Sequence, residues 1–544
     1  MQAAKLFVKC LEKADVKYIF GVPGEENLAF LEAIRESSIE MITTRDEQTA
    51  VFMAATIGRL TGRIGVALST LGPGATNLVT GVAYAQLGAM PLLVITGQKP
   101  IRKSKQGKFQ IIDVVGMMKP ITKFSETIVS ADRVPSSVDH AIRTAEKERP
   151  GAVHLELPED IAEEESQTPT TTWQKVRRPI ADDKSIKALI SAIEQSKSPI
   201  VLIGSGANRK LVRKQLTSFI NKTDIPFIST QMGKGVVDES DSRYIGTAAL
   251  SDNDFVHSAL KYSDLILMIG HDITEKPPVI DGNTQHFVHI DFSAAEIDDV
   301  YTPDLEIIGD ISHTLWAAAE NVKPQKWNFD KFYTVKDALS KNLTGKASSN
   351  DFPIKPQRFV TSLRKVLPKD AILSLDNGMY KLWIARNYPA NEQNTVLLDN
   401  ALATMGAGLG VAMSAKMVFP EKKVVVIAGD GGFLMNLADL ETAKRLDLDI
   451  TIVIIRDDGY GMIKWKQDSM NLKDYGLSFS NPDFIKLAES FGAKGYKIES
   501  TNEFEETLAS CIESKGLNII DLPIDYSENN TYFGKDLEKQ IKGL

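Results

Sequence analysis

Short apolar segments alternate with segments of helix length in three parts of this 544-residue sequence, and this alternation constrains the fold more than any other feature. In the first part the apolar segments include YIFGVPG, PLLVITG and GAVHLELPEDI. Strands that are separated by helices form βαβ units, which build parallel sheets covered by helices on both faces. The predicted fold class is therefore α/β, with three doubly wound α/β domains whose sheets are mainly parallel.

Polar segments separate the three parts. The first of them, Glu163 to Pro179, is rich in threonine and charged residues and is predicted to be a linker. The predicted domains cover residues 1–165, 185–325 and 355–530, which are ordinary sizes for a single hydrophobic core. The first and third domains share the order of a strand followed by a Gly-rich turn, which fits a chain built by duplication.

Charge and cysteine content narrow the function classes. The chain has 63 basic and 71 acidic residues, and its formal net charge of -8 is spread along the sequence, which argues against a nucleic-acid partner. Cys10 and Cys511 are the only cysteines, so a disulfide framework is not expected and the predicted location is cytoplasmic. No run of 18 apolar residues occurs, and residues 1–16 read as an amphipathic helix without signal-peptide features, so no membrane association is predicted.

Acidic residues follow two apolar strands in the third part. Asp430 stands between glycines after Val424–Ala428, and Asp457 and Asp458 follow Ile450–Ile455 directly. The carboxyl ends of neighbouring parallel strands meet at one edge of a sheet, where α/β proteins bind ligands. Carboxylates there suit an octahedral Mg²⁺ or Ca²⁺ that anchors a diphosphate, with backbone N–H groups of a helix starting near Gly432 turned toward the phosphates. The alternative is that Asp430 only caps that helix.

A Gly-rich turn also occurs in the middle part, in GSGANR at Gly204–Arg209. Glycines let backbone N–H groups approach a phosphate at the start of a helix. A tight structural turn between a strand and a helix has the same composition, so both interpretations stay open.

The spacing of these motifs resembles a known family. A Gly-Asp-Gly motif followed some two dozen residues later by a paired Asn-Asn or its Asp variant is similar to the diphosphate motif of thiamine-diphosphate-dependent enzymes. Here Arg456 and Asp457 stand at the pair, and Asp457 lies 27 positions after Asp430. Among them the chain resembles the acetolactate synthases, in particular the catalytic large subunit of the catabolic form, which also has Asp at the second position. The resemblance implies that Asp430, Asp457 and the carbonyl of Gly459 hold the metal. Arg456 departs from the usual Asn, and its charge is expected to face solvent or to pair with a neighbouring acid.

Other segments extend the resemblance over nearly the whole chain. TTRDEQTAVFMAATIGRLTG is similar to the segment whose glutamate contacts the aminopyrimidine of the cofactor, which implies that role for Glu47, in an apolar setting that favours its protonated form. GKFQ implies that Phe109 and Gln110 face the reacting centre, and Met405 takes the place of the residue that bends the cofactor. The three domains would then be pyrimidine-binding, central and diphosphate-binding. An exposed helix acid for Glu47, and core packing for Phe109 and Met405, are the alternatives.

The resemblance implies the following site residues. The catalytic residues would be Glu47, Phe109 and Gln110. The cofactor-binding residues would be Gly24, Glu47, Gly378, Met379, Tyr380, Met405, Gly429, Asp430, Gly431, Gly432, Tyr460, Gly461 and Met462. The metal ligands would be Asp430, Asp457 and Gly459.

The implied reaction is decarboxylation of pyruvate and carboligation to a second pyruvate, giving 2-acetolactate and CO₂. The implied cofactors are thiamine diphosphate and Mg²⁺, and the implied assembly is a homodimer or homotetramer. FAD in the central domain, which biosynthetic members carry, is not favoured. Acceptor choice is open, because Lys466 stands where relatives carry a selecting residue.

The alternatives are another thiamine-diphosphate-dependent carboligase, lyase or decarboxylase, a non-catalytic binding protein, and a nicotinamide dehydrogenase. Decarboxylases use paired histidines, and none of the 7 His are adjacent. A dehydrogenase fingerprint with its downstream acid is not found.

Overall fold

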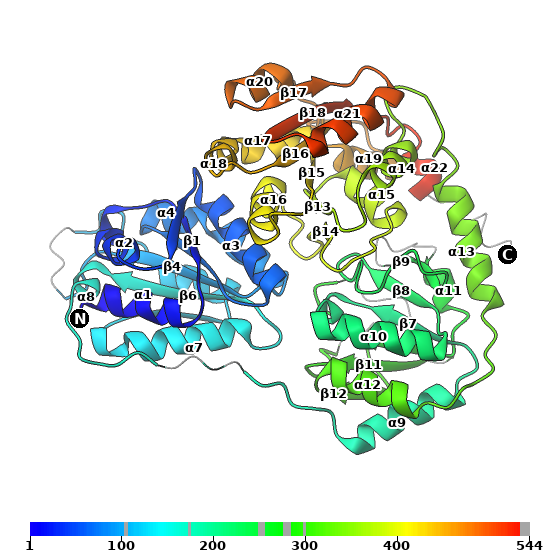
Figure 1. Ribbon diagram of the computed structural model, residues 1–544, viewed down its shortest axis with the longest axis horizontal. Helices are drawn as coiled ribbons and strands as arrows, with labels where there is room; N and C mark the ends of the chain where they lie inside the picture. Colours follow the sequence, from blue (N-terminus) through cyan, green and yellow to red (C-terminus); the bar gives the residue numbers. More distant parts are fainter. Residues whose placement is uncertain are drawn as a thin grey trace. The chain divides into compact units, whose positions relative to one another are not determined.

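Among the described residues, three parallel sheets of six strands each form the framework of the protein (Figure 1). The computed structural model describes residues 1–102, 107–171, 174, 176–248, 256–275, 284–297 and 301–533. The predicted α/β class with three parallel-sheet domains is confirmed. Each predicted domain range contains one sheet, while the exact limits 1–165, 185–325 and 355–530 stay a prediction.

The first sheet has the strand order β2-β1-β3-β4-β6-β5. Its strands are β1 (Tyr18–Gly21), β2 (Glu40–Thr43), β3 (Gly65–Ser69), β4 (Leu92–Gln98), β5 (Phe124–Thr127) and β6 (Ala152–Pro158). Its helices are α1 (Ala3–Lys13), α2 (Leu28–Arg35), α3 (Glu47–Thr61), α4 (Gly72–Asn77), α5 (Val79–Leu87), α6 (Val114–Met118), α7 (Val134–Glu146) and α8 (Glu159–Ala162). Strands β3, β4 and β6 are buried along their whole length, as expected for parallel strands covered on both faces.

The second sheet has the order β12-β11-β10-β7-β8-β9. Its strands are β7 (Pro199–Ile203), β8 (Phe227–Thr230), β9 (Tyr244–Ala248), β10 (Leu265–Ile269), β11 (His286–Asp291) and β12 (Leu305–Ile308). The helices of this part are α9 (Asp183–Gln195), α10 (Lys210–Thr223), α11 (Val256–Leu260), α12 (Ile311–Asn321) and α13 (Asp330–Leu343).

The third sheet has the order β14-β13-β15-β16-β18-β17, the same pattern as the first sheet. Its strands are β13 (Ile372–Leu375), β14 (Val396–Leu397), β15 (Val424–Gly429), β16 (Ile450–Arg456), β17 (Lys494–Lys497) and β18 (Leu517–Pro523). Its helices are α14 (Pro356–Val366), α15 (Met379–Asn387), α16 (Ala407–Val418), α17 (Asp430–Met435), α18 (Leu440–Arg445), α19 (Gly461–Ser469), α20 (Phe484–Ser490), α21 (Thr501–Glu513) and α22 (Asn529–Phe533). The shared order agrees with the shared rhythm seen in the sequence.

The chain forms two compact units, and each of the three sheets lies entirely within one of them. One unit joins the first sheet to residues 401–421 and 435–448, and the other joins the second and third sheets. In the first unit α16 packs on α3, where the Ser414 hydroxyl donates to the Met53 carbonyl at 2.9 Å and Gly410 lies against Phe52. No helix among the described residues is long and apolar enough to span a membrane.

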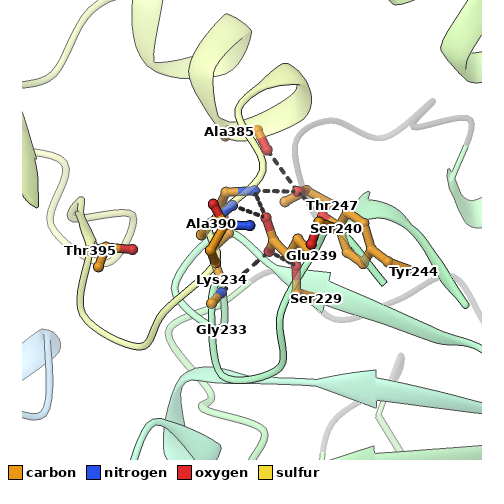
Figure 2. A network of polar contacts seen from close by, with 12 residues as sticks. Ser229, Gly233, Lys234, Glu239, Ser240, Tyr244, Thr247, Ala385, Ala390 and Thr395 are labelled. Atoms are coloured by element: carbon orange, nitrogen blue, oxygen red, sulfur yellow. Dashed lines mark hydrogen bonds and ion pairs between the residues drawn. The ribbon is translucent and has the colours of Figure 1, made fainter. Parts of the chain in front are cut away.

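A buried polar network joins the second and third sheets within their unit (Figure 2). Lys234 and Glu239 form an ion pair at 2.6 Å with both side chains 1% exposed. Glu239 also accepts from the backbone N–H of Ala390, at 2.9 Å, and the Thr247 hydroxyl donates to the carbonyl of Ala385 at 2.7 Å. Ala385 lies near the end of α15, so this network fixes the helix that begins at Met379.

Candidate active site

Asp430 and Asp457 lie at the tips of two hydrogen-bonded strands, as the sequence predicted. Strands β15 and β16 pair in parallel, with Gly429 opposite Ile455. Asp430 follows β15 directly, and Asp457 follows β16. The helix after β15 begins at Asp430 rather than near Gly432, and the connection to β16 consists of the short helices α17 and α18. The predicted meeting of the two acidic turns is therefore present, although the helix between them is broken.

The Asp430 carboxylate is held by three hydrogen bonds. Oδ1 accepts from the N–H of Gly431 at 2.9 Å, and Oδ2 accepts from the N–H of Asp458 and from Nδ2 of Asn481, both at 2.8 Å. Asp430 is 1% exposed, and this burial raises its pKa above the ordinary value. A capping role alone does not account for a carboxylate that also binds Asp458 and Asn481.

Asp457 lies in an environment that disfavours its charge. Burial is the main cause that raises its pKa to about 7, and the charges of Asp430 and Asp458 add to it. A β carbon on Gly461 would lie 2.2 Å from Asp457 Oδ2, so a larger residue there would force this carboxylate to move. Carboxylates gathered in this way gain from a cation, because its charge offsets both the burial and the mutual repulsion.

Arg456 pairs with acidic side chains, which was one of the two arrangements expected from the sequence; the other was a charge facing solvent. Its Nε donates to Asp521 Oδ1 at 2.8 Å, and its Nη1 lies 3.4 Å from Asp458 Oδ2. Asp521 belongs to β18, the strand next to β16. The guanidinium therefore adds positive charge beside the acidic turn.

Three buried polar atoms around this turn make no hydrogen bond of good geometry among the described residues, although the backbones of Gly429 and Tyr380 lie near the two hydroxyls among them. They are Oδ1 of Asn481 and the hydroxyls of Tyr380 and Tyr526. The nearby charges of Asp457 and Asp430 help to raise the pKa of the Tyr526 hydroxyl, after burial as the main cause. A bound anion with its cation would give these atoms partners, so the residues present fit a metal–diphosphate group. Sequence reasoning missed Asn481 and Tyr526, which lie in loops without any periodic signal.

The turn after β13 carries three more of the predicted cofactor-binding residues, Gly378, Met379 and Tyr380. Gly378 precedes α15, and a β carbon there would lie 2.4 Å from the ring of Tyr380. Met379 and Tyr380 are buried in the first turn of α15. Lys381 is 5% exposed, and its ammonium donates to Asn377 Oδ1 at 2.6 Å and to the Asp399 carbonyl at 3.0 Å.

The start of α19 follows the acidic turn. The rings of Tyr460 and Phe479 meet edge to face, and a β carbon on Gly431 would lie 3.1 Å from each of them. Gly461 and Met462 form the first turn of α19, and Gly432 is buried in α17. Further along α19, Lys466 is exposed with its ammonium 5.2 Å from the Trp465 ring centroid.

Glu47 lies in the other compact unit, at the first position of α3. Its side chain is 8% exposed, so the alternative of an exposed helix acid does not hold. Asn77 Nδ2 donates to Glu47 Oε2 at 3.0 Å, while a β carbon on Gly74 would lie 3.0 Å from Oε1. Asn77 thus orients the carboxyl group, and Gly74 keeps space beside its other oxygen. Sequence reasoning did not identify Asn77.

The other predicted residues of this unit are Gly24, Phe109, Gln110 and Met405. Gly24 lies against Thr70, whose side chain would be 2.3 Å from an added β carbon. Phe109 is 66% exposed, so it does not pack in the core of this chain. Gln110 is exposed with φ +58°, and its carbonyl lies against Gly72, where a β carbon would be 2.4 Å away. Met405 is half-buried before Gly406, whose φ is +87°.

The Gly204 turn does not present a free phosphate cradle. The turn packs against Gly270, whose carbonyl would be 2.3 Å from a β carbon on Gly204. The N–H of Ser205 donates to the buried carboxyl group of Glu275 at 3.0 Å. The same carboxyl group also accepts from the N–H of Met232 at 3.3 Å. The Glu275 side chain takes the N–H of Ser205, and the Gly270 carbonyl accepts from the N–H of Gly206 at 2.8 Å, so these groups are not free for a phosphate and the structural interpretation of GSGANR is favoured.

Comparison with known proteins finds similarity along the whole chain. Three family models of thiamine pyrophosphate enzymes match the chain. The N-terminal TPP binding domain matches residues 1–117, the central domain matches residues 186–318, and the C-terminal TPP binding domain matches residues 376–522. The acetolactate synthase of Bacillus subtilis (strain 168) is 32% identical, over 100% of this chain and 96% of that protein. The catabolic acetolactate synthase of Raoultella terrigena is 32% identical (98% and 96%), and the acetolactate synthase large subunit of Haemophilus influenzae is 29% identical (97% and 95%).

Proposed function

The chain belongs to the thiamine pyrophosphate enzyme family, and from this premise we propose that it is an enzyme that converts two molecules of pyruvate into 2-acetolactate and CO₂. One pyruvate loses its carboxylate as CO₂, its remaining two-carbon unit forms a bond to the keto carbon of the second pyruvate, and one proton is taken up. The observation that carries the proposal is the pair of carboxylates, Asp430 and Asp457, at the tips of neighbouring parallel strands.

Asp430, Asp457 and the carbonyl of Gly459 would hold Mg²⁺ at this edge, with the diphosphate and water as further ligands. No group of three His, Cys, Asp or Glu side chains that could hold a metal ion occurs in the described ranges, so in this proposal the coordination is completed by the Gly459 carbonyl, the diphosphate and water. The buried hydroxyls of Tyr380 and Tyr526 are suited to donate to diphosphate oxygens. The other cofactor-binding residues predicted from the sequence stay part of this proposal.

When bound, thiamine diphosphate supplies the nucleophilic carbon and the electron sink for loss of CO₂. Glu47, which is 8% exposed, would donate a hydrogen bond from its carboxyl group to the pyrimidine ring. Asn77 fixes the carboxyl group through Oε2 and leaves Oε1 to face the ring. Gln110 would orient the acceptor pyruvate, and Phe109 and Met405 would exclude water from the reacting carbon.

Assembly and location are also part of the proposal. We expect a homodimer or homotetramer, because apolar side chains near the acidic turn are exposed in a single chain: Ile463 (51%), Met470 (66%), Leu472 (53%) and Tyr475 (87%). FAD is not included, because Glu275 occupies the Ser205 N–H in the central domain. The free thiols of Cys10 and Cys511 are buried, which fits the reducing cytoplasm.

A pyruvate-only assay tests the proposal. The protein is incubated with thiamine diphosphate and Mg²⁺, and CO₂ and 2-acetolactate are measured, the latter as acetoin after acid treatment. We expect one CO₂ for each 2-acetolactate, and a loss of both in Glu47→Gln with cofactor binding retained. Glu146→Gln is the control. Glu146 accepts a hydrogen bond from the N–H of Ile64, which directly precedes the N-terminal end of β3. Cofactor binding without consumption of pyruvate would refute the assigned donor.

A further inference from the structure

A third carboxylate lies beside the two proposed metal ligands. Asp458 follows Asp457 directly, has φ +52°, and is not expected to ligate the metal. A non-glycine residue in this left-handed region is strained and needs surrounding contacts to hold it there. The contacts of Asp458 therefore decide how the turn from Asp457 to Gly459 presents its oxygens.

Asn481 supplies the central contact. Its Nδ2 donates at 2.8 Å to Oδ2 of Asp430 and at 2.8 Å to Oδ1 of Asp458, so one amide group ties the two strand-tip turns together. Oδ1 of Asn481 is buried and accepts no hydrogen bond among the described residues. The amide is thus oriented entirely by two carboxylates, with its donor group toward both.

The backbone next to Asn481 runs along the same turn. Phe479 N–H donates to the Asp458 carbonyl at 3.3 Å, and Tyr460 N–H donates to the Leu477 carbonyl at 3.1 Å. These two hydrogen bonds flank Gly459 without using its carbonyl oxygen. The segment that carries Asn481 therefore fixes the residues on both sides of a proposed metal ligand.

Arg456 holds the other oxygen of Asp458. Its guanidinium is anchored on Asp521 at 2.8 Å and approaches Asp458 Oδ2 at 3.4 Å. The Asp458 side chain is 55% exposed, so the ion pair is weak and mainly reduces repulsion from Asp430 and Asp457. This contact gives a function to the residue that departs from the family motif.

We propose that Asn481 is a positioning residue for the cation: it locks Asp430 to Asp458, so that the carboxylate of Asp457 and the carbonyl of Gly459 are presented to one ion. This inference rests on the proposed function, because it concerns the same site. Groups that orient metal ligands typically contribute 10-fold to 100-fold to metal affinity. Arg456 supports the same arrangement by keeping the third carboxylate paired.

The test compares Asn481→Leu and Asn481→Ser with the unchanged protein. Leu keeps the branched shape of Asn but cannot donate, and Ser is smaller and adds no apolar bulk, so a common effect reports the lost amide. The control is Asn391→Leu, because Asn391 is 7% exposed and its Nδ2 donates to Asp238 Oδ1 at 3.0 Å, away from the acidic turn. Mg²⁺ is titrated at fixed thiamine diphosphate while tryptophan fluorescence reports binding, and the melting temperature is measured without Mg²⁺ and cofactor.

We expect both Asn481 variants to raise the Mg²⁺ concentration at half-saturation about 10-fold or more. Their kcat at saturating Mg²⁺ should recover most of the unchanged value, and their metal-free melting temperature should change no more than that of the control. Unchanged half-saturation in both variants would overturn the inference, as would a weaker affinity that follows a loss of metal-free stability. If the unchanged protein binds neither Mg²⁺ nor thiamine diphosphate, the proposed function itself fails, which is a distinct result.

Discussion

Gly461→Ala should separate cation binding from folding stability. The β carbon of alanine would lie 2.2 Å from Oδ2 of Asp457 and 3.3 Å from its Cγ. Non-bonded heavy atoms prefer a separation of about 3.5 Å, so the carboxylate oxygen must move by more than about 1 Å. Metal–ligand distances tolerate deviations of only about 0.2 Å, so Asp457 cannot rotate away and still bind the same ion. The steric conflict therefore falls on a proposed metal ligand.

We expect the half-saturating Mg²⁺ concentration to rise at least 10-fold in Gly461→Ala, which corresponds to about 1.4 kcal/mol of binding free energy. Metal-free stability should be equal or higher, since Ala is favoured over Gly within a helix by up to about 1 kcal/mol. The assay is isothermal titration of Mg²⁺ at fixed thiamine diphosphate, with thermal unfolding of the metal-free protein beside it. Ser469→Ala, at the other end of α19, controls for helix propensity. If Gly461→Ala binds Mg²⁺ as the unchanged protein does, the Asp457 carboxylate is not a ligand in the arrangement described.

Three further predictions concern buried polar groups. Burial raises the pKa of Glu275 from 4.5 to about 7, so the native state holds more protons than the unfolded state between these pH values and loses stability as the pH rises through them. Thermal unfolding should show that Glu275→Gln loses less stability than the unchanged protein between pH 5 and pH 8, by up to about 3 kcal/mol, and equal losses would contradict the assignment. Lys234→Met should lower the free energy of unfolding by about 3 kcal/mol or more, seen as a lower melting temperature, because it leaves Glu239 buried without its counter-charge. The control Lys222→Met, which breaks an exposed pair with Glu320, should have little effect. Tyr526→Phe should weaken thiamine diphosphate binding about 10-fold in a fluorescence titration without lowering the stability of the cofactor-free protein, and unchanged affinity would show that its buried hydroxyl does not bind the cofactor.

The sequence alone located both strand tips of the acidic site. Val424–Ala428 and Ile450–Ile455 are continuous apolar runs, which is the pattern of parallel strands buried on both faces, and the structure has them as β15 and β16 within one residue at each end. Because such strands end at a common edge, residues placed directly after them could be brought together without coordinates. Glu47 was found in a different way, through its resemblance to a family segment.

Other parts of the site could not be predicted in this way. Asn481 lies in a loop 24 positions after Asp457, and Asn77 is the last residue of α4, 30 positions after Glu47. Single polar residues in loops or at helix ends carry no periodicity, and their partners are chosen by how the chain turns after each element. The sequence also could not decide whether GSGANR binds a phosphate or is a structural turn. The deciding contact is the hydrogen bond from the Ser205 N–H to Glu275, which is 70 positions away.

The sequence by itself determined the fold class, the three sheets and the two acidic turns, because hydrophobic periodicity and glycine placement are local properties that act within one strand or turn. Only the tertiary structure decided which side chains orient these groups: Asn481 between Asp430 and Asp458, Arg456 on Asp521, and Asn77 on Glu47. The physical reason is that a buried hydrogen bond depends on distance and direction to within a few tenths of an ångström, and these are fixed by the packing of segments that are distant along the chain.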